Sequence, residues 1–164
     1  MSRGFKEVQS ASKQYTKKVV LYGTESVVAP PTVLPVRADP GSAGYDFSTP
    51  VDVTVGPGET KTVWTNVKAY MDFDEVLLLF VRSSIGIKKG IVLANGTGVI
   101  DASYYENPSN DGNIGIALKN TTGRTIEFKA GERIAQGIFT KFLVADQDSV
   151  LREVREGGTG SSGQ

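Results

Sequence analysis

The sequence predicts an all-β fold, a sandwich or jelly roll, with one short helix. Short apolar runs alternate with Gly-, Pro- and Asn-rich turns along most of the chain, and no long helical patterns lie between them. Several runs alternate apolar and polar residues, as half-buried strands do. With 164 residues, the chain is long enough for one domain with a sizeable core.

The first part of the chain is polar and then becomes strand-like. Residues 1–18 carry five basic residues and few apolar ones, so we expect a flexible N-terminal arm. Val19–Tyr22 is typical of a strand. The apolar stretch Val27–Val36 contains three prolines, which favours an edge or extended segment because proline cannot donate to a central ladder.

Four further strands are predicted in the next forty or so residues. Tyr45–Phe47 and Val51–Val55 alternate, with the Pro-Gly turns before and after them marking their limits. Thr62–Val67 follows. Val76–Val81 is apolar without alternation, which indicates a strand buried on both faces.

The helix is expected at about Ser84 to Lys89, directly after Arg82-Ser83-Ser84. Hydroxyl residues behind an arginine, with a glycine close by, suit a loop whose backbone N–H groups meet an anion. A plain strand-to-helix turn capped by serine is the alternative.

The stretch Leu93–Asn120 predicts a hairpin, with Gly98–Asp101 and Ile114–Leu118 as its arms and the turn-rich Asn107–Gly112 between them. Asp101 follows two β-branched residues, and a carboxylate at the end of a buried strand is costly unless it is hydrogen-bonded or used. The hairpin is therefore either a ligand site with Tyr104 beside the carboxylate, or a surface hairpin with a capping aspartate.

Two more strands, Thr125–Phe128 and Ile134–Leu143, flank a turn. The Gly-rich end, residues 157–164, cannot fold alone and is either a disordered tail or tag, or a flap that orders over bound phosphates. The predicted organisation is therefore an arm (1–18), a β domain (19–150) and a C-terminal arm (151–164).

Composition excludes several kinds of chemistry. Lys+Arg and Asp+Glu are both 18, so the chain lacks the basic excess of a general nucleic-acid or membrane-surface binder. Cysteine and histidine are absent, which excludes disulfides, thiolate nucleophiles, Ser-His triads and His- or Cys-bound metals. Catalysis would have to use Asp, Glu, Lys, Tyr or a hard cation. No apolar signal or membrane span is evident, so we expect a cytoplasmic protein.

Five segments in one order resemble the motifs of the trimeric dUTPases, of a bacterial or phage type. The resemblance covers about Val33 to the end, and five ordered motifs are far more specific than any one. The segments are Ala43–Asp46, Arg82–Ser84, Gly98–Asp101 with Tyr104, Gly131–Gln136 and Arg155–Gly163.

This resemblance implies a jelly-roll or distorted β-barrel subunit in a homotrimer. Each active site would lie between subunits, and each C-terminal arm would close over a neighbouring site. The implied reaction is Mg²⁺-dependent hydrolysis of dUTP to dUMP and pyrophosphate, which keeps uracil out of DNA and supplies dUMP. Mg²⁺ would be held mainly by the triphosphate.

The resemblance also implies roles for individual residues. Asp101 would activate the water that attacks the α-phosphate, and Asp46 would touch the water shell of Mg²⁺ or serve only a turn network. Tyr104 would pack on the deoxyribose. Phosphates would be bound by Arg82, Ser83, Ser84 and Gln136, uracil would be read near Asn95, Gly98, Ile100 and Gly115, and the tail would supply Arg155, Thr159, Gly160 and Ser161.

Three positions depart from the family pattern. Thr159 stands where a phenylalanine usually stacks on uracil, so the lid is missing or Trp64 or Tyr105 supplies it. The tail arginine is offset in many members, which leaves Arg155 or Arg152 as the phosphate clamp. Ser103 replaces an aspartate before the tyrosine.

Two other functions fit the same fold. A dCTP deaminase shares the Arg-Ser-Ser motif but needs a glutamate late in the second hairpin strand, where this chain reads Ile116–Asn120 without one. The other is a nucleotide-gated regulatory protein with a protein partner, a role that the altered tail leaves open.

Overall fold

The computed structural model describes residues 2–150, and these form an all-β fold, as predicted. A single helical element of more than one turn is described, the π-helical Ser84–Lys88 (η2), where the short helix was expected. The strands are β1 (Gly4–Glu7), β2 (Lys17–Leu21), β3 (Thr24–Val28), β4 (Val36–Arg37), β5 (Tyr45–Ser48), β6 (Val53–Val55), β7 (Thr60–Trp64), β8 (Val67–Tyr70), β9 (Glu75–Val81), β10 (Ile91–Leu93), β11 (Gly98–Asp101), β12 (Gly115–Asn120), β13 (Ile126–Phe128) and β14 (Arg133–Lys141).

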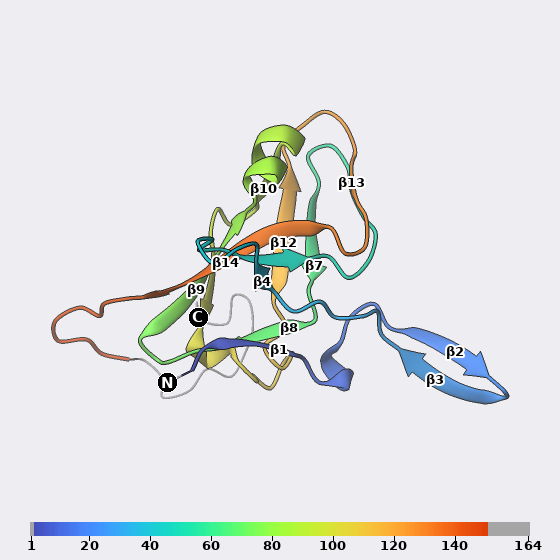
Figure 1. The fold of residues 1–164 in the computed structure, drawn as a ribbon, viewed down its shortest axis with the longest axis horizontal. Coiled ribbons are helices and arrows are strands. Elements are labelled where there is room, and N and C mark those ends of the chain that lie inside the picture. Colours follow the sequence, from blue (N-terminus) through green and yellow to red (C-terminus); the bar gives the residue numbers. More distant parts are fainter. Residues whose placement is uncertain (1, 151–164) are drawn as a thin grey trace.

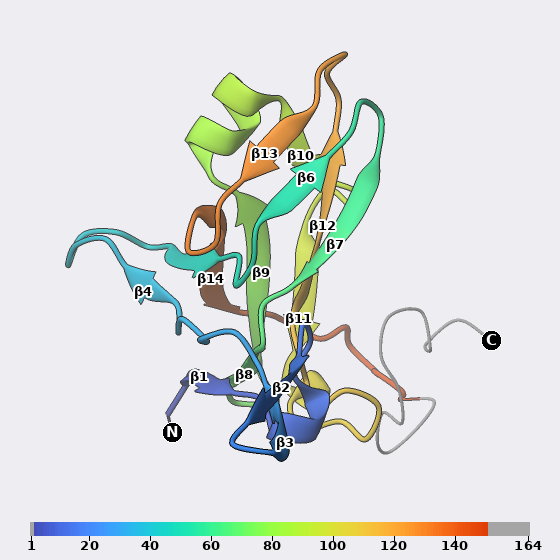
Figure 2. The same ribbon diagram turned by 90° about the vertical axis from the view of Figure 1, so that its right-hand side faces the viewer.

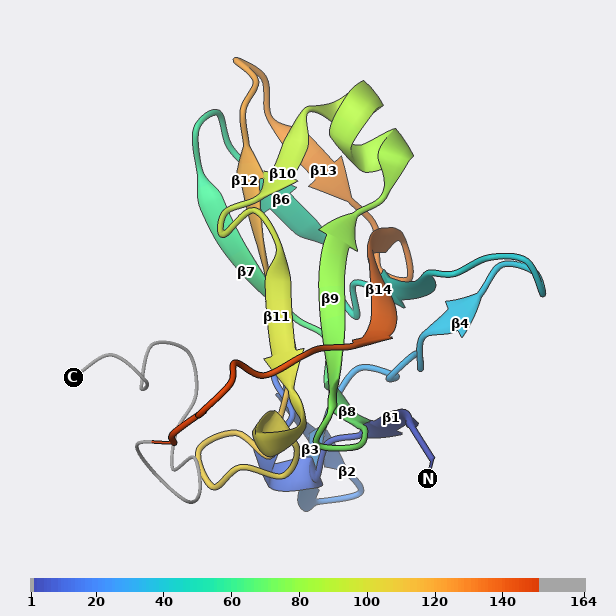
Figure 3. The same cartoon turned by 90° about the vertical axis from the view of Figure 1, so that its left-hand side faces the viewer.

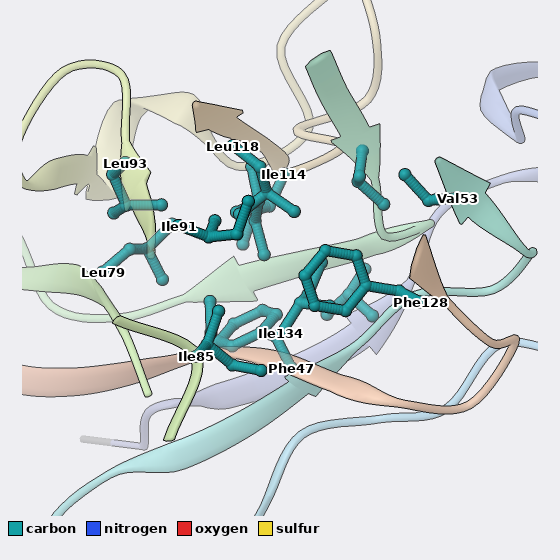
Figure 4. Close-up of a cluster of buried hydrophobic side chains, with 14 of the residues drawn as sticks. Phe47, Val53, Leu79, Ile85, Ile91, Leu93, Ile114, Leu118, Phe128 and Ile134 are labelled. Carbon is teal, nitrogen blue, oxygen red and sulfur yellow. The ribbon is translucent and has the colours of Figure 1, made fainter. Parts of the chain in front are cut away.

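Two antiparallel sheets form the body. One has the strand order β11-β9-β14-β5-β4, and the other has the order β10-β12-β7 with the β13-β6 pair close by (Figure 2). Apolar side chains from both sheets meet in one core, which includes Leu79 of β9, Leu118 of β12, Phe128 of β13 and Ile134 of β14 (Figure 4). The layers therefore pack face to face around a dry interior, as in a sandwich.

Strand β9 is an inner strand of the larger sheet, because it pairs with β11 on one side and β14 on the other (Figure 3). Leu77 and Leu79 point into the core and are almost fully buried. Leu78 and Phe80 lie on the opposite face and are only partly buried. The prediction of burial on both faces is therefore right for the inner face only, within this single chain.

The predicted hairpin of the Leu93–Asn120 stretch is wrong. Strand β11 pairs with β9, whereas β12 pairs with β10 and β7, so the two arms belong to different sheets. The turn-rich residues 102–114 form a compact loop with its own internal hydrogen bonds instead of a short reversal. A loop of that length lets the chain cross from one sheet to the other.

The expected flexible arm is also wrong for its first residues. Strand β1 pairs with β8 over its whole length. Phe5 packs edge-on against Tyr45 and Phe47, and Val8 is only 3% exposed. Two apolar side chains are sufficient to attach this segment to the body, because β1 also pairs with the edge of β8 and Phe5 also packs against aromatic rings.

Strands β2 and β3 form a hairpin that projects from the body (Figure 1). Its turn, Tyr22-Gly23, has positive φ at both residues, the conformation that suits a two-residue hairpin. The predicted strand Thr62–Val67 divides into β7 and β8 at Asn66, where φ is +60°. No helix within residues 2–150 is long and apolar enough to cross a membrane.

Because Leu118 is completely buried between the sheets, Leu118→Ala should lower the free energy of unfolding by about 2–5 kcal/mol. Chemical denaturation of the variant and of Val20→Ala, at an exposed hairpin position, provides the comparison. Equal midpoints for the two variants would contradict the assignment of Leu118 to the core.

Candidate functional site

A cleft of about 490 Å³ opens where β9 ends and the helix η2 begins. Arg82, Ser83 and Ser84 line it from this junction, and Gln136 lines it from β14. The cleft thus brings together residues from two distant segments that the sequence predicts to bind phosphate. Ser83 and Ser84 are exposed, so their hydroxyl groups are accessible to a ligand.

Asp46, which is 8% exposed on β5, organises this cleft. One carboxylate oxygen lies 2.8 Å from Nε of Arg82, and the other lies 3.0 Å from Nη1 of Arg133. Because Asp46 holds Arg82 through Nε, the terminal guanidinium nitrogens can serve an anion. Asp46 thus holds two arginines in place. The sequence did not indicate these two contacts.

The backbone of Gly44 makes room for Gln136. A Cβ added at Gly44 would lie 2.5 Å from the side-chain oxygen of Gln136. Any larger residue would therefore displace the amide from the cleft, which explains the glycine in the Ala43–Asp46 segment.

Asp101 lies at the other end of the same sheet. It ends β11 and pairs in register with Val76, whereas Arg82 follows Val81 at the far end of β9. Six steps along the chain, from Val76 to Arg82, at about 3.3 Å each, separate the two levels by roughly 20 Å. Figure 3 shows the end of β11 near the bottom and the helix at the top. One chain therefore does not bring Asp101 to its own cleft.

Tyr104 follows Asp101 in a short 3₁₀ turn, and burial and two hydrogen bonds hold its side chain in place. Its ring is 8% exposed, and its hydroxyl group donates to the carbonyl oxygen of Asn113 at 2.8 Å. The side-chain amide of Asn110 donates to the same hydroxyl, also at 2.8 Å. The ring is therefore held in place before any ligand binds.

A buried lysine that the sequence gave no reason to select supports this loop. Lys68 of β8 donates to both carboxylate oxygens of Asp111 at 3.0 Å and to Glu106 at 2.9 Å. Burial opposes the charged form, but the hydrogen bonds that Lys68 donates to these carboxylates, with their negative charge, outweigh it and raise the pKa of Lys68. Its hydrogen bond in turn lowers the pKa of Glu106. These contacts of Lys68 tie the loop to β8.

The residues expected to read uracil are distributed over both sheets. Gly98 and Ile100 lie on β11, and Asn95 lies in the turn before it. Gly115 begins β12 opposite Trp64 of β7, and a Cβ added there would lie 2.9 Å from the Trp64 ring. These residues therefore belong to two segments rather than to one hairpin.

The two aromatic candidates for a lid occupy different places. Trp64 lies against Gly115, beside a position expected to contact the base. The ring of Tyr105 instead lies 6.0 Å from that of Tyr70, with the ammonium group of Lys68 5.1 Å from its centre. Of the two, only Trp64 lies near a predicted base-reading residue.

The predicted tail residues Arg155, Thr159, Gly160 and Ser161, and the alternative Arg152, lie outside the described residues. Within residues 2–150, no three carboxylates gather in a group that could hold a metal ion.

The chain matches a known family over most of its length. The family model described as dUTPase matches residues 31–163. The deoxyuridine 5′-triphosphate nucleotidohydrolase of Lactococcus lactis is 46% identical over 131 residues, 79% of this chain and 87% of that protein. The Haemophilus influenzae enzyme of the same name is 32% identical over 155 residues, 90% of this chain and 99% of its own length.

Solved structures that are similar to this chain are also dUTPases. The dUTPase from Streptococcus mutans is 48% identical, with a TM-score of 0.66 over 69% of this chain and 88% of that chain. The dUTPase from Staphylococcus aureus phage phi11 is only 20% identical, yet it has a TM-score of 0.67 over 93% of this chain and 97% of its own. The second likeness concerns the fold alone.

Asp46→Asn should weaken the binding of inorganic triphosphate to the cleft by about 10-fold, since loss of a charge-assisted contact that orients a guanidinium costs roughly 1.5 kcal/mol. Titration calorimetry measures the change. Arg82→Ala should weaken binding at least as much, and Arg124→Ala, at an exposed position, provides the control. Unchanged affinity in both cleft variants would show that triphosphate binds elsewhere.

Proposed function

The chain belongs to the dUTPase family, and from this premise we propose that it hydrolyses dUTP to dUMP and pyrophosphate with Asp101 as the general base. The observation that carries the proposal is the cleft in which Arg82, two serines and Gln136 meet. An arginine oriented by a buried carboxylate, beside exposed hydroxyl groups, suits a triphosphate. We place the reaction in the cytoplasm, where deoxynucleotides are made and used.

The reaction needs a base that is neither histidine nor cysteine, because the chain contains neither. Asp101 would accept a proton from a water molecule as its oxygen attacks the α-phosphorus. The new P–O bond forms as the bond to the bridging oxygen breaks, and pyrophosphate leaves with both electrons of that bond. General-base assistance of this kind contributes roughly 10²–10⁴-fold to the rate.

Mg²⁺ would enter with the substrate. Held mainly by the triphosphate, it would neutralise phosphate charge. Both oxygens of Asp46 already contact arginines, so a contact between Asp46 and the cation would pass through water. Arg82 and Gln136 would orient the phosphates on the protein side.

Selectivity would come from groups on the other side of the site. Backbone N–H and C=O groups near Gly98 and Ile100 would pair with uracil and mismatch the amino group of cytosine. Leaving such groups unpaired is how a site rejects a close analogue by a large factor. The fixed ring of Tyr104 would lie against the deoxyribose and exclude a 2′-hydroxyl group.

We further propose a homotrimer, in which Asp101 of one subunit completes the cleft of another. The distance along β9 between Asp101 and Arg82 supports this arrangement. So does the outer face of the same sheet, where Val99 is 57% exposed and Leu78, Phe80 and Ile138 are partly exposed. The C-terminal arm, residues 151–164, would close over a neighbouring site.

The function is tested by measuring pyrophosphate release with Mg²⁺ from dUTP, dTTP, dCTP and UTP. We expect rapid release from dUTP alone. Asp101→Asn should reduce the turnover number by at least about 100-fold while dUTP binding persists, because only the proton acceptor is lost. Near-normal turnover in this variant would rule out Asp101 as the base.

Subunit mixing tests the shared site. Asp101→Asn and Arg82→Ala homotrimers should each be nearly inactive, but mixed trimers should regain part of the activity, since some sites combine an intact Asp101 with an intact Arg82. Refolding each variant alone provides the control. Activity that never recovers on mixing would contradict a site built from two subunits.

Two further measurements on the same nucleotides, ammonia release and dUTP binding, separate the alternatives. Ammonia release from dCTP would indicate the deaminase, although Ile116–Asn120 lacks the glutamate that this chemistry needs. Binding of dUTP without hydrolysis would indicate a nucleotide-gated regulator with a protein partner.

A further inference from the structure

Residues 8–15, here called the N-terminal clamp, run between β1 and β2. They precede the part of the chain that the family model matches, which begins at residue 31. The clamp nevertheless contacts two segments that the proposed function uses, the loop carrying Tyr104 and the strand facing Gly115.

The clamp is joined to the Tyr104 loop at two points. The backbone N–H of Gln9 donates to the carboxylate of Asp111 at 2.7 Å. The side-chain amide of Asn113 donates to the carbonyl oxygen of Ser12 at 3.1 Å. The carbonyl oxygen of Asn113 is the group that accepts the Tyr104 hydroxyl. Ser12 is therefore two hydrogen bonds away from the ring expected to contact the sugar.

The clamp is also joined to the end of β7. The hydroxyl oxygen of Tyr15 accepts the backbone N–H of Trp64 at 3.0 Å. The backbone N–H of Gln14 donates to the side-chain oxygen of Asn66 at 2.8 Å, and Val8 donates to the carbonyl oxygen of Asn66 at 3.1 Å. Trp64 pairs with Gly115, so the clamp holds the edge strand β7, which lies beside that glycine.

The phosphate cleft has a different set of supports. Arg82 is held by Asp46 of β5, and Gln136 lies on β14 next to Gly44. The described hydrogen bonds of the clamp go to the loop 102–114 and to residues 64–66, on the opposite side of the site. Disturbing the clamp should therefore affect the nucleoside and the phosphates unequally.

We propose that the N-terminal clamp positions Tyr104 and Gly115 for the nucleoside, and so sets affinity and selectivity for the base and sugar. This proposal rests on the proposed dUTPase function. A site holds its selectivity only if the residues behind it lock the contacting groups, and the clamp supplies that second layer. It acts through Asn113 and Trp64 and contributes positioning, with no group of its own in contact with substrate.

Tyr15→Phe is the sharpest variant, because it removes one oxygen and leaves the ring. Tyr22→Phe makes the same chemical change at the fully exposed hairpin tip and is the matched control. Trp64 is the only tryptophan in the chain, so its fluorescence follows dUMP binding without labels. Inorganic pyrophosphate, titrated by calorimetry, probes the phosphate side.

Loss of one hydrogen bond should weaken dUMP binding to Tyr15→Phe by about 3- to 10-fold and leave pyrophosphate binding unchanged. KM for dUTP should rise by a similar factor with kcat nearly unchanged, and preference for dUTP over UTP should fall. Tyr22→Phe should match the wild type in all of these. Asn66→Gly, which keeps the positive φ and removes the acceptor for Gln14, should change dUMP binding in the same direction.

Two results would overturn the proposal. Tyr15→Phe and Asn66→Gly could lower the melting temperature yet keep wild-type dUMP affinity and selectivity when folded, which would make the clamp purely structural. Equal weakening of dUMP and pyrophosphate would show a general disturbance of the site. If the wild type releases no pyrophosphate from dUTP, the proposed function and this proposal fall together, whereas an active wild type with unaffected variants refutes the clamp alone.

Discussion

The pairing of β9 on both edges is the constraint on which the rest of the structure depends. Because β9 is held between β11 and β14, its two ends are fixed relative to each other. One end leads into Arg82 and the anion cleft, and the other lies beside Asp101. The same strand sends Leu77 and Leu79 into the core. Core packing and the distance between Asp101 and the cleft at Arg82 therefore both depend on β9, and neither can change without the other.

Buried charge organises the cleft and the Tyr104 loop in a similar way. Asp46 spans Arg82 and Arg133 at the cleft, and Lys68 joins Asp111 to β8 beneath the Tyr104 loop. Removing one partner of such a pair leaves a desolvated charge, so each pair strongly favours one geometry. The loop around Tyr104 consequently owes its shape to a lysine that faces the interior, not to apolar packing alone.

The local pattern of the sequence predicted most strands well, and the long-range pairing of strands poorly. Alternation identified β5 and β6, and the short helix was expected directly after the Arg-Ser-Ser segment, because both depend on neighbouring residues. The hairpin was wrong because nothing near Gly98 or Gly115 specifies which strand will be the partner. Lys68 was missed because a lysine in a strand usually faces water, and Asp111, its buried partner, lies 43 positions away.

The β2–β3 hairpin is a suitable place to label or immobilise this protein. Its tip has Tyr22 fully exposed, and a Cβ added at Gly23 would meet no described atom within 4 Å. It also precedes the family-matched residues, and its strands pair only with each other in the described sheets. Since the chain contains no cysteine, a single one introduced at the tip would be the unique attachment point for a dye or a surface tether. Exposed loop tips tolerate such changes best, so the tip is the natural place to immobilise or label the protein.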